Sequence, residues 1–174
     1  MSLGVLAGNA AEGWHPCSFL LTDVVGSVGL WEGDPGAMAA AVARHDALVV
    51  EEVTAAGGSV VRYKGEGDST FSVFESPLDA VTAAVAIQRA MGAEPWRLPA
   101  PLKVRAGVHT GEAEGRDGQW YGPAVNRAAR LRGLAGGAQT LVSGVTAGLV
   151  ADKLPRGLRL AYRGRQTLRG IERP

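Results

Sequence analysis

Cysteine is almost absent, because Cys17 is the only one among 174 residues. The chain therefore cannot form an internal disulfide or a metal cage of several thiolates, and we expect a small buried side chain at this position. No apolar run approaches the roughly 20 residues that span a bilayer, and residues 1–14 lack the basic and apolar segments of a secretory signal. We expect a cytoplasmic domain without membrane contact.

The chain has no excess of positive or negative charge, since it contains 18 Lys and Arg and 17 Asp and Glu. This balance gives no electrostatic reason to expect binding to nucleic acid or to an anionic membrane. Aromatic residues are also scarce, at 6%, while apolar residues reach 46%. The length and this composition fit one domain whose core is built mainly from Val, Leu and Ala.

Turn and capping signals divide the chain into alternating strands and helices. Residues 1–15 are rich in Gly and Ala without periodicity, and we expect them to be disordered or vector-derived, with a single domain over 16–174. Strands are predicted at 17–22, 59–63, 70–74 and 102–109, and helices from Asp34-Pro35 to Gly57-Gly58 and from Ser76-Pro77 to about Gly92.

This order, βαββαβ, is the split βαβ arrangement of ferredoxin-like α+β domains. Beyond this core we expect a turn at 116–118, an added helix from about Gly122 to Leu134, a short helix or turn near 145–150, and a C-terminal hairpin around Gly164.

This topology brings two aspartates together as a candidate metal site. Asp23 ends the first strand and Asp68 opens the third, and in a split βαβ sheet these strands are adjacent and antiparallel. The two carboxylates therefore meet at one edge, where they would repel each other without a cation between them. Magnesium suits a pair of carboxylates completed by water and phosphates. The alternative is that Asp23 caps a turn and Asp68 lies at a hairpin tip.

A second candidate site lies on the predicted helix after Gly122. Asn126 and Arg130 are spaced i and i+4, so they share one face of that helix. An amide and a guanidinium suit a sugar hydroxyl and a phosphate, because arginine offers a planar fork of donors. An exposed polar stripe would show the same spacing.

Four ordered segments make the pattern specific. The stretches at 19–27 (FLLTDVVGS), 64–68 (KGEGD), 104–111 (VRAGVHTG) and 121–131 (YGPAVNRAARL) resemble successive motifs of class III adenylate and guanylate cyclases. The resemblance runs from about Cys17 to the C-terminus. It implies a ferredoxin-like domain that works as a head-to-tail homodimer with sites at the interface.

The resemblance also implies residue roles. Asp23 and Asp68, with the backbone carbonyl of Val24, would bind two Mg²⁺ or Mn²⁺ ions, and Arg105 would contact the triphosphate. Asn126 would orient the ribose and Arg130 would stabilise charge on the α-phosphate. Arg169 stands where the family usually has a phosphate-binding lysine.

The implied reaction is the conversion of ATP to 3′,5′-cyclic AMP and pyrophosphate. Lys64 stands where adenylate cyclases have a lysine that reads adenine. Gln119 stands where they usually have an aspartate, and its amide can both accept and donate hydrogen bonds. We therefore expect an adenylate cyclase; the alternatives are relaxed ATP/GTP specificity or a silent homologue that only binds nucleotide or dimerises.

Overall fold

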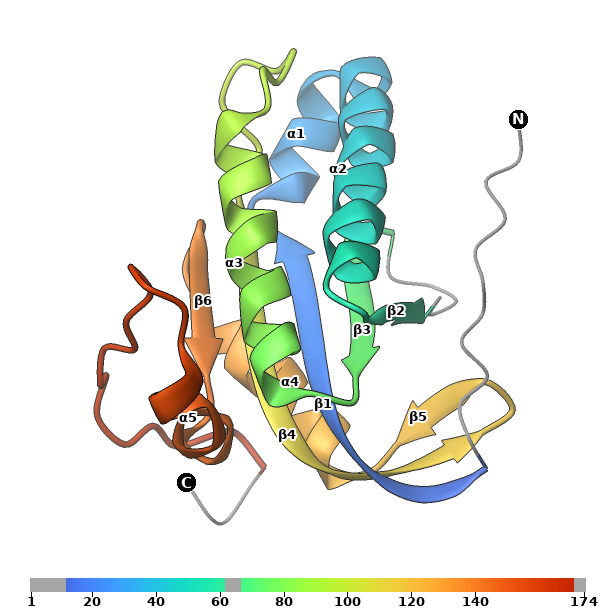
Figure 1. The fold of residues 1–174 in the computed structure, drawn as a ribbon. Coiled ribbons are helices and arrows are strands. Elements are labelled where there is room, and N and C mark those ends of the chain that lie inside the picture. The colour runs from blue at the N-terminus through green and yellow to red at the C-terminus, as the bar shows by residue number, and fades with distance from the viewer. Residues whose placement is uncertain (1–11, 62–66, 171–174) are drawn as a thin grey trace.

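The computed structural model describes residues 12–61 and 67–170, in which six strands form one sheet. The strands are β1 (Gly13–Val24), β2 (Ser59–Val61), β3 (Ser69–Phe74), β4 (Val104–Arg116), β5 (Gln119–Tyr121) and β6 (Gln139–Val142). The helices are α1 (Ser27–Gly33), α2 (Pro35–Ala55), α3 (Pro77–Ala93), α4 (Pro123–Leu134) and α5 (Gly144–Val150), followed by a 3₁₀ helix at Ala151–Lys153. Figure 1 shows their arrangement.

The sheet order is β2-β3-β1-β4-β5, with neighbouring strands antiparallel, and β6 pairs with β4 in parallel. This places β1 between β3 and β4, the order of a split βαβ core. The predicted ferredoxin-like α+β fold and its βαββαβ sequence are confirmed.

The two faces of the sheet bury different apolar clusters, because side chains alternate along each strand. Leu20 and Val24 of β1 pack with α2 and α3 on one face, whereas Phe19 and Leu21 pack with α4 on the other. Figure 1 shows α2 and α3 side by side over one face and α4 behind the sheet. None of the helices in the described part of the chain is long and apolar enough to cross a membrane.

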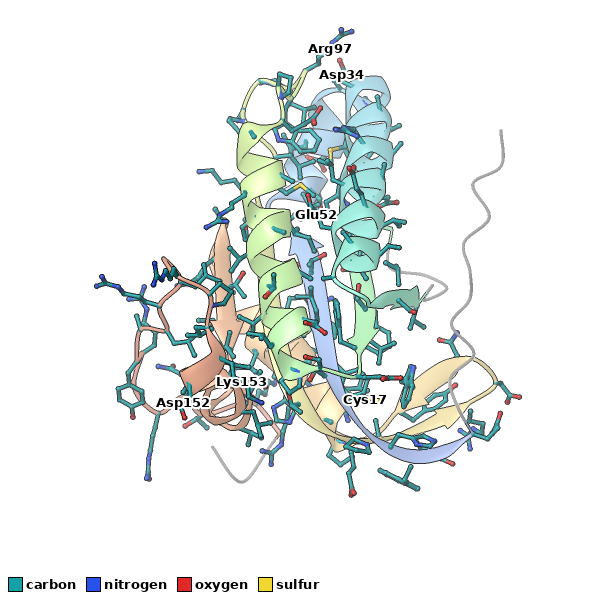
Figure 2. The ribbon with its side chains drawn as sticks, viewed as in Figure 1. Cys17, Asp34, Glu52, Arg97, Asp152 and Lys153 are labelled. Carbon is teal, nitrogen blue, oxygen red and sulfur yellow. The ribbon has the colours of Figure 1, made fainter. Side chains whose placement is uncertain are left out.

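Helix starts agree with the capping signals in the sequence. The Asp34 carboxylate accepts a hydrogen bond from the Ala37 amide at 2.9 Å at the start of α2, where Figure 2 labels it. The Ser76 hydroxyl accepts one from the Asp79 amide at 3.3 Å at the start of α3. A proline in the first turn completes both caps.

Cys17 is buried, as expected from its apolar neighbours. Burial raises the pKa of its thiol, and the nearby carboxylate of Glu75 raises it further. The thiol therefore stays protonated and unreactive at neutral pH.

The prediction of a C-terminal hairpin around Gly164 is wrong. Residues 154–170 contain no strand, and between 155 and 170 every side chain except Leu158 and Leu168 is exposed. A hairpin needs an apolar face packed against the rest of the protein, and in this arginine-rich stretch only Leu168 is buried. Gly157, Gly164 and Gly170 have positive φ and bend it repeatedly.

The expected limits of two other segments, β1 and β4, also change. Strand β1 begins at Gly13, inside the segment assigned to a disordered N-terminus, because it pairs with the distal part of β4. Strand β4 runs on to Arg116 and returns as β5 through the predicted turn, so the hairpin lies here instead. Residues 1–11 lie outside the described part of the chain.

Candidate active site at the end of the central strands

Asp23 lies at the centre of a three-strand row. Its Cα is paired with Ser69 of β3 on one side and with Arg105 of β4 on the other. Asp68 immediately precedes Ser69, so the prediction that both aspartates reach the same end of the sheet is confirmed. Asp23 follows the alternation of Phe19 and Leu21, which places it on the sheet face that carries α4.

The Asp23 carboxylate is fully engaged by its two neighbours. Ser69 Oγ donates to Oδ1 at 2.8 Å, and Arg105 donates to Oδ2 through Nε at 2.7 Å and also through Nη2. The Asp23 side chain is 14% exposed and that of Arg105 is 34% exposed, so this ion pair is partly withdrawn from water. Charge-assisted hydrogen bonds of this kind are short and strong.

The Asp68 carboxylate is less well hydrogen-bonded than that of Asp23. Its Oδ2 is buried and has no hydrogen-bond partner within the described residues. A buried carboxylate oxygen without a donor is costly to the fold, and a cation is one group that would satisfy it. This is the feature of the structure that fits a bound metal ion.

The donor set around these aspartates fits magnesium or manganese. Val24, whose carbonyl was predicted to assist, is the last residue of β1. The described residues contain no cluster of three or more Asp, Glu, His or Cys able to enclose an ion. An ion held by two carboxylates and a carbonyl would complete its coordination shell with water and substrate oxygens, as Mg²⁺ usually does.

Helix α4 carries the second predicted pair. Gly122 at its N-terminus has φ 128°, Pro123 occupies the first turn, and Ala124, Val125 and Ala128 are buried against the sheet. Asn126 and Arg130 are exposed on the opposite side of the helix. Within the described ranges, neither side chain has a hydrogen bond or ion pair, so both are available to a ligand or a partner.

Gly107 of β4 sets how close α4 lies to the sheet. A Cβ at this position would lie 2.4 Å from the Arg132 amide nitrogen and 2.5 Å from the Ala128 carbonyl oxygen. Only glycine allows the helix backbone to rest directly on the strand. The same helix reaches β1 through Arg132, which donates to the Thr22 carbonyl at 3.4 Å.

Gln119, which was predicted to contact the base, lies far from Asp23. Gln119 opens β5 and pairs with Arg116. Along β1 the sheet runs from the Gly13–Gly115 pair to the Asp23–Arg105 pair, a distance of roughly 33 Å at about 3.3 Å per residue. Figure 1 shows β5 at the opposite end of the sheet from the head of β1. Arg169 is exposed beyond the buried Leu168. Lys64 lies outside the described residues.

A single chain thus assembles one part of the predicted site, Asp23, Asp68 and Arg105, and leaves Gln119 far from it. Ser69 was missed by the sequence reasoning. Its signal was its position directly after Asp68, where an antiparallel register places it beside Asp23.

His109 has no part in this cluster. Its side chain is 5% exposed, and its Nδ1 shares a hydrogen bond of 2.8 Å with Ser143 Oγ, the N-cap of α5. Burial, assisted by the positive charge of Arg127, lowers the pKa of His109 to about 4. His109 is therefore a packed residue of β4.

Comparisons of sequence point to cyclases. No protein-family model matches the chain. An uncharacterized protein of Mycobacterium tuberculosis is 41% identical over 157 residues, which cover 90% of this chain and 53% of that protein. The chain therefore spans about half the length of the first curated relatives it matches. The adenylate cyclase of Lachancea kluyveri is 28% identical over 151 residues, covering 72% of this chain and 8% of that protein.

Solved structures match over almost the whole chain. The adenylate/guanylate cyclase/hydrolase of Silicibacter pomeroyi has a TM-score of 0.76 at 25% identity, covering 92% of this chain and 93% of that one. An adenylate cyclase of Trypanosoma brucei, in its monomeric state, has a TM-score of 0.79 at 25% identity, covering 91% and 86%. The fold is that of a nucleotide cyclase catalytic domain. With its four ordered motifs, the chain is a domain of the class III adenylate/guanylate cyclase type.

Proposed function

We propose that this domain is an adenylate cyclase that converts ATP to 3′,5′-cyclic AMP and pyrophosphate at sites shared across a homodimer. The observation that carries the proposal is the strand register, which aligns Ser69, Asp23 and Arg105 across three strands with Asp68 beside them. Two carboxylates and a guanidinium at one sheet end form a site for a metal-bound polyphosphate.

In this proposal Asp23, Asp68 and the Val24 carbonyl hold two Mg²⁺ or Mn²⁺ ions. Bound ions of this kind lower the pKa of a coordinated hydroxyl and neutralise phosphate oxygens. The buried Oδ2 of Asp68 supports the assignment, since it has no hydrogen-bond partner among residues 12–61 and 67–170 and needs a cation or a donor.

The reaction is an in-line displacement at the α-phosphorus. The ribose 3′-oxygen forms the new bond to phosphorus, the bond to the bridging β-phosphate oxygen breaks, pyrophosphate leaves, and the hydroxyl proton passes to water. Arg105 would hold the triphosphate, Asn126 the ribose, and Arg130 the charge that develops on the α-phosphate. His109, buried on Ser143, is not available as a base.

The separation of the parts of the site within one chain supports a shared site in a dimer. Arg130 and Asn126 face away from the sheet that carries Asp23, and Gln119 lies roughly 33 Å from Asp23 along β1 and β4. In a head-to-tail homodimer one protomer supplies the metal-binding aspartates and Arg105. Its partner supplies the base-reading residues, Asn126, Arg130 and Arg169. We expect a monomer to be inactive.

The direct test measures cyclic product by mass spectrometry with ATP and then GTP, each in Mg²⁺ and then in Mn²⁺. The protein concentration must be one at which light scattering detects a dimer. Cyclic AMP as the main product supports the proposal. Metal-dependent nucleotide binding without any cyclic product would instead support the silent homologue.

Nucleotide preference provides a finer test, because Gln119 stands where an aspartate would accept from the adenine amino group. The Gln119 amide can also donate, which would admit the guanine carbonyl. We expect Gln119→Asp to increase the ratio of kcat/KM for ATP over GTP, by about tenfold for one discriminating hydrogen bond. Matched assays of both nucleotides give this ratio, and an unchanged or inverted ratio would contradict the assignment of Gln119 to the base.

A further inference from the structure

Arg105 and Asp23 have roles that compete with each other. Arg105 is assigned to the triphosphate and Asp23 to a metal ion, yet in the structure Arg105 donates to Asp23 through both Nε and Nη2. A metal ion that takes Oδ2 of Asp23 must displace this guanidinium. The ion pair is therefore an obstacle to cation binding in the protein without nucleotide.

We propose that Arg105 is a resident counter-cation of the metal site, which occupies Asp23 until a polyphosphate draws it away. Cation binding at Asp23 is then coupled to nucleotide binding through a single side chain. This inference rests on the proposed metal-binding role of Asp23, and it adds a control on when that carboxylate becomes available.

The geometry allows Arg105 to leave without disturbing the fold. Its side chain is 34% exposed, so the guanidinium can turn toward solvent or a ligand while its backbone stays paired opposite Asp23. A polyphosphate offers several acceptor oxygens to the planar donor fork of arginine, a better partner than one carboxylate oxygen. Ser69 remains on Oδ1 and keeps the Asp23 carboxylate oriented.

Electrostatics also favour the exchange in one direction. While Arg105 is bound, Asp23 is already neutralised, and an incoming divalent ion meets a positive charge at the same oxygen. Once phosphates hold Arg105, the freed carboxylate attracts the ion. Asp23 and the phosphates compete for Arg105, so Asp23 should weaken nucleotide binding in the absence of metal. Because coupling between two ligands is reciprocal, a bound metal ion should in turn strengthen nucleotide binding.

The first experiment measures Mn²⁺ binding to the 174-residue chain without nucleotide, by electron paramagnetic resonance of free Mn²⁺. We expect Arg105→Gln to lower the Kd for Mn²⁺ by about tenfold or more, as expected when a charge-assisted pair is removed. Lys103→Gln is the matched control, because it removes one positive charge from an exposed residue next to β4. It should change the Kd by less than about twofold, since Lys103 does not bond to Asp23.

The second experiment measures ATP binding in EDTA, where metal is absent. Asp23→Asn should strengthen binding because it frees Arg105, whereas Asp68→Asn, which removes the same charge without touching Arg105, should have a smaller effect. Circular dichroism of each variant confirms folding, and the rise in Tm on adding Mn²⁺ gives a second measure of ion affinity.

The outcomes separate this inference from the proposed function. If Arg105→Gln binds Mn²⁺ no more tightly than the unchanged chain, while Asp23→Asn still weakens binding, the counter-cation role is wrong and the metal site stands. If neither Asp23→Asn nor Asp68→Asn weakens Mn²⁺ binding in either background, the metal site itself is wrong. A gain in Arg105→Gln that Asp23→Asn abolishes supports the inference.

Discussion

Asp23 and Asp68 lie side by side in the topology but differ in how well the fold satisfies them. Asp23 accepts hydrogen bonds from Ser69 and Arg105, so it contributes to the stability of the sheet end. Asp68 keeps a buried oxygen without a partner in the described residues, and an oxygen that finds neither a donor nor a cation lowers stability. A residue retained at such a cost is typical of a functional site, where activity and stability oppose each other.

The two aspartates should therefore respond differently to amide substitution. Asp68→Asn should lower the proposed cyclase activity by about 100-fold or more, since it removes a proposed metal ligand, and should leave Tm unchanged or raise it by up to about 3 °C. Asp23→Asn should lower activity similarly but also lower Tm, because Arg105 loses its partner. Calorimetry on both variants checks this, and a lower Tm for Asp68→Asn than for Asp23→Asn would contradict it.

His109 gives the fold a dependence on pH. Its pKa in the folded protein is about 4, below the usual value of about 6.5. The unfolded chain therefore binds a proton more readily, and the stabilisation is complete above pH 6.5 and is lost as pH falls toward 4. We expect this group to lower the free energy of unfolding by about 2 kcal/mol between pH 7 and pH 5. Urea unfolding of His109→Gln at both pH values should show a smaller loss than the unchanged chain; equal losses would assign the effect to other groups.

At the scale of elements, the position of α4 depends on its direct contact with β4 at Gly107. A methyl group there would collide with backbone atoms of Ala128 and Arg132, which cannot move aside as a side chain could. The helix must shift, and Asn126 and Arg130 would shift with it. The Asp23 end of the sheet is held separately by β1, β3 and β4.

Gly107→Ala should therefore destabilise the fold by about 1–3 kcal/mol and reduce kcat while leaving Mn²⁺ affinity at the aspartates nearly unchanged. Gly133→Ala is the matched control, since Gly133 belongs to the same helix and a Cβ there would meet nothing within 4 Å. It should keep activity and leave stability equal or slightly higher, as alanine favours helices. Comparable losses in both variants would show that α4 is sensitive to any substitution.

Local signals predicted the main elements, and non-local pairing explains what they missed. The caps at Asp34 and Ser76 and the proline after Gly122 are encoded within a few residues, so α2, α3 and α4 were predicted closely. The extension of β1 to Gly13 and the parallel pairing of β6 depend on β4, far away in the sequence. No local pattern carries that information.

The candidate site was also predicted in part: the positions of its residues were foreseen, but the contacts of their side chains were not. Topology alone placed Asp23 beside Asp68, and helical spacing placed Asn126 with Arg130 on one exposed face of α4. The pairing of Arg105 with Asp23 was not foreseen, because it depends on side-chain direction at one level of the sheet. The hydroxyl of Ser69 was also missed, although the antiparallel register beside Asp23 could have indicated it.

At the scale of the whole molecule, the separation of the two halves leads to a test of assembly. Asp23→Asn and Arg130→Ala should each inactivate the proposed homodimer, but they lie in different halves of the proposed shared site. A mixed dimer of the two variants has one site with both residues intact and one with neither. Equal mixing with free exchange should therefore restore roughly a quarter of the original activity, because half of the dimers are mixed and each holds one complete site.

The matched control mixes Asp23→Asn with Asp68→Asn. Both lesions lie in the same half, so each site of the mixed dimer still lacks one aspartate, and no activity should return. Activity is measured as cyclic AMP formed after the two variants are mixed and allowed to exchange, at a concentration where the unchanged chain is dimeric. Recovery in the first mixture but not in the second assigns the aspartates and Arg130 to opposite protomers. Failure of the first mixture, with exchange verified by mass spectrometry of differently labelled chains, would mean that each chain forms its site alone.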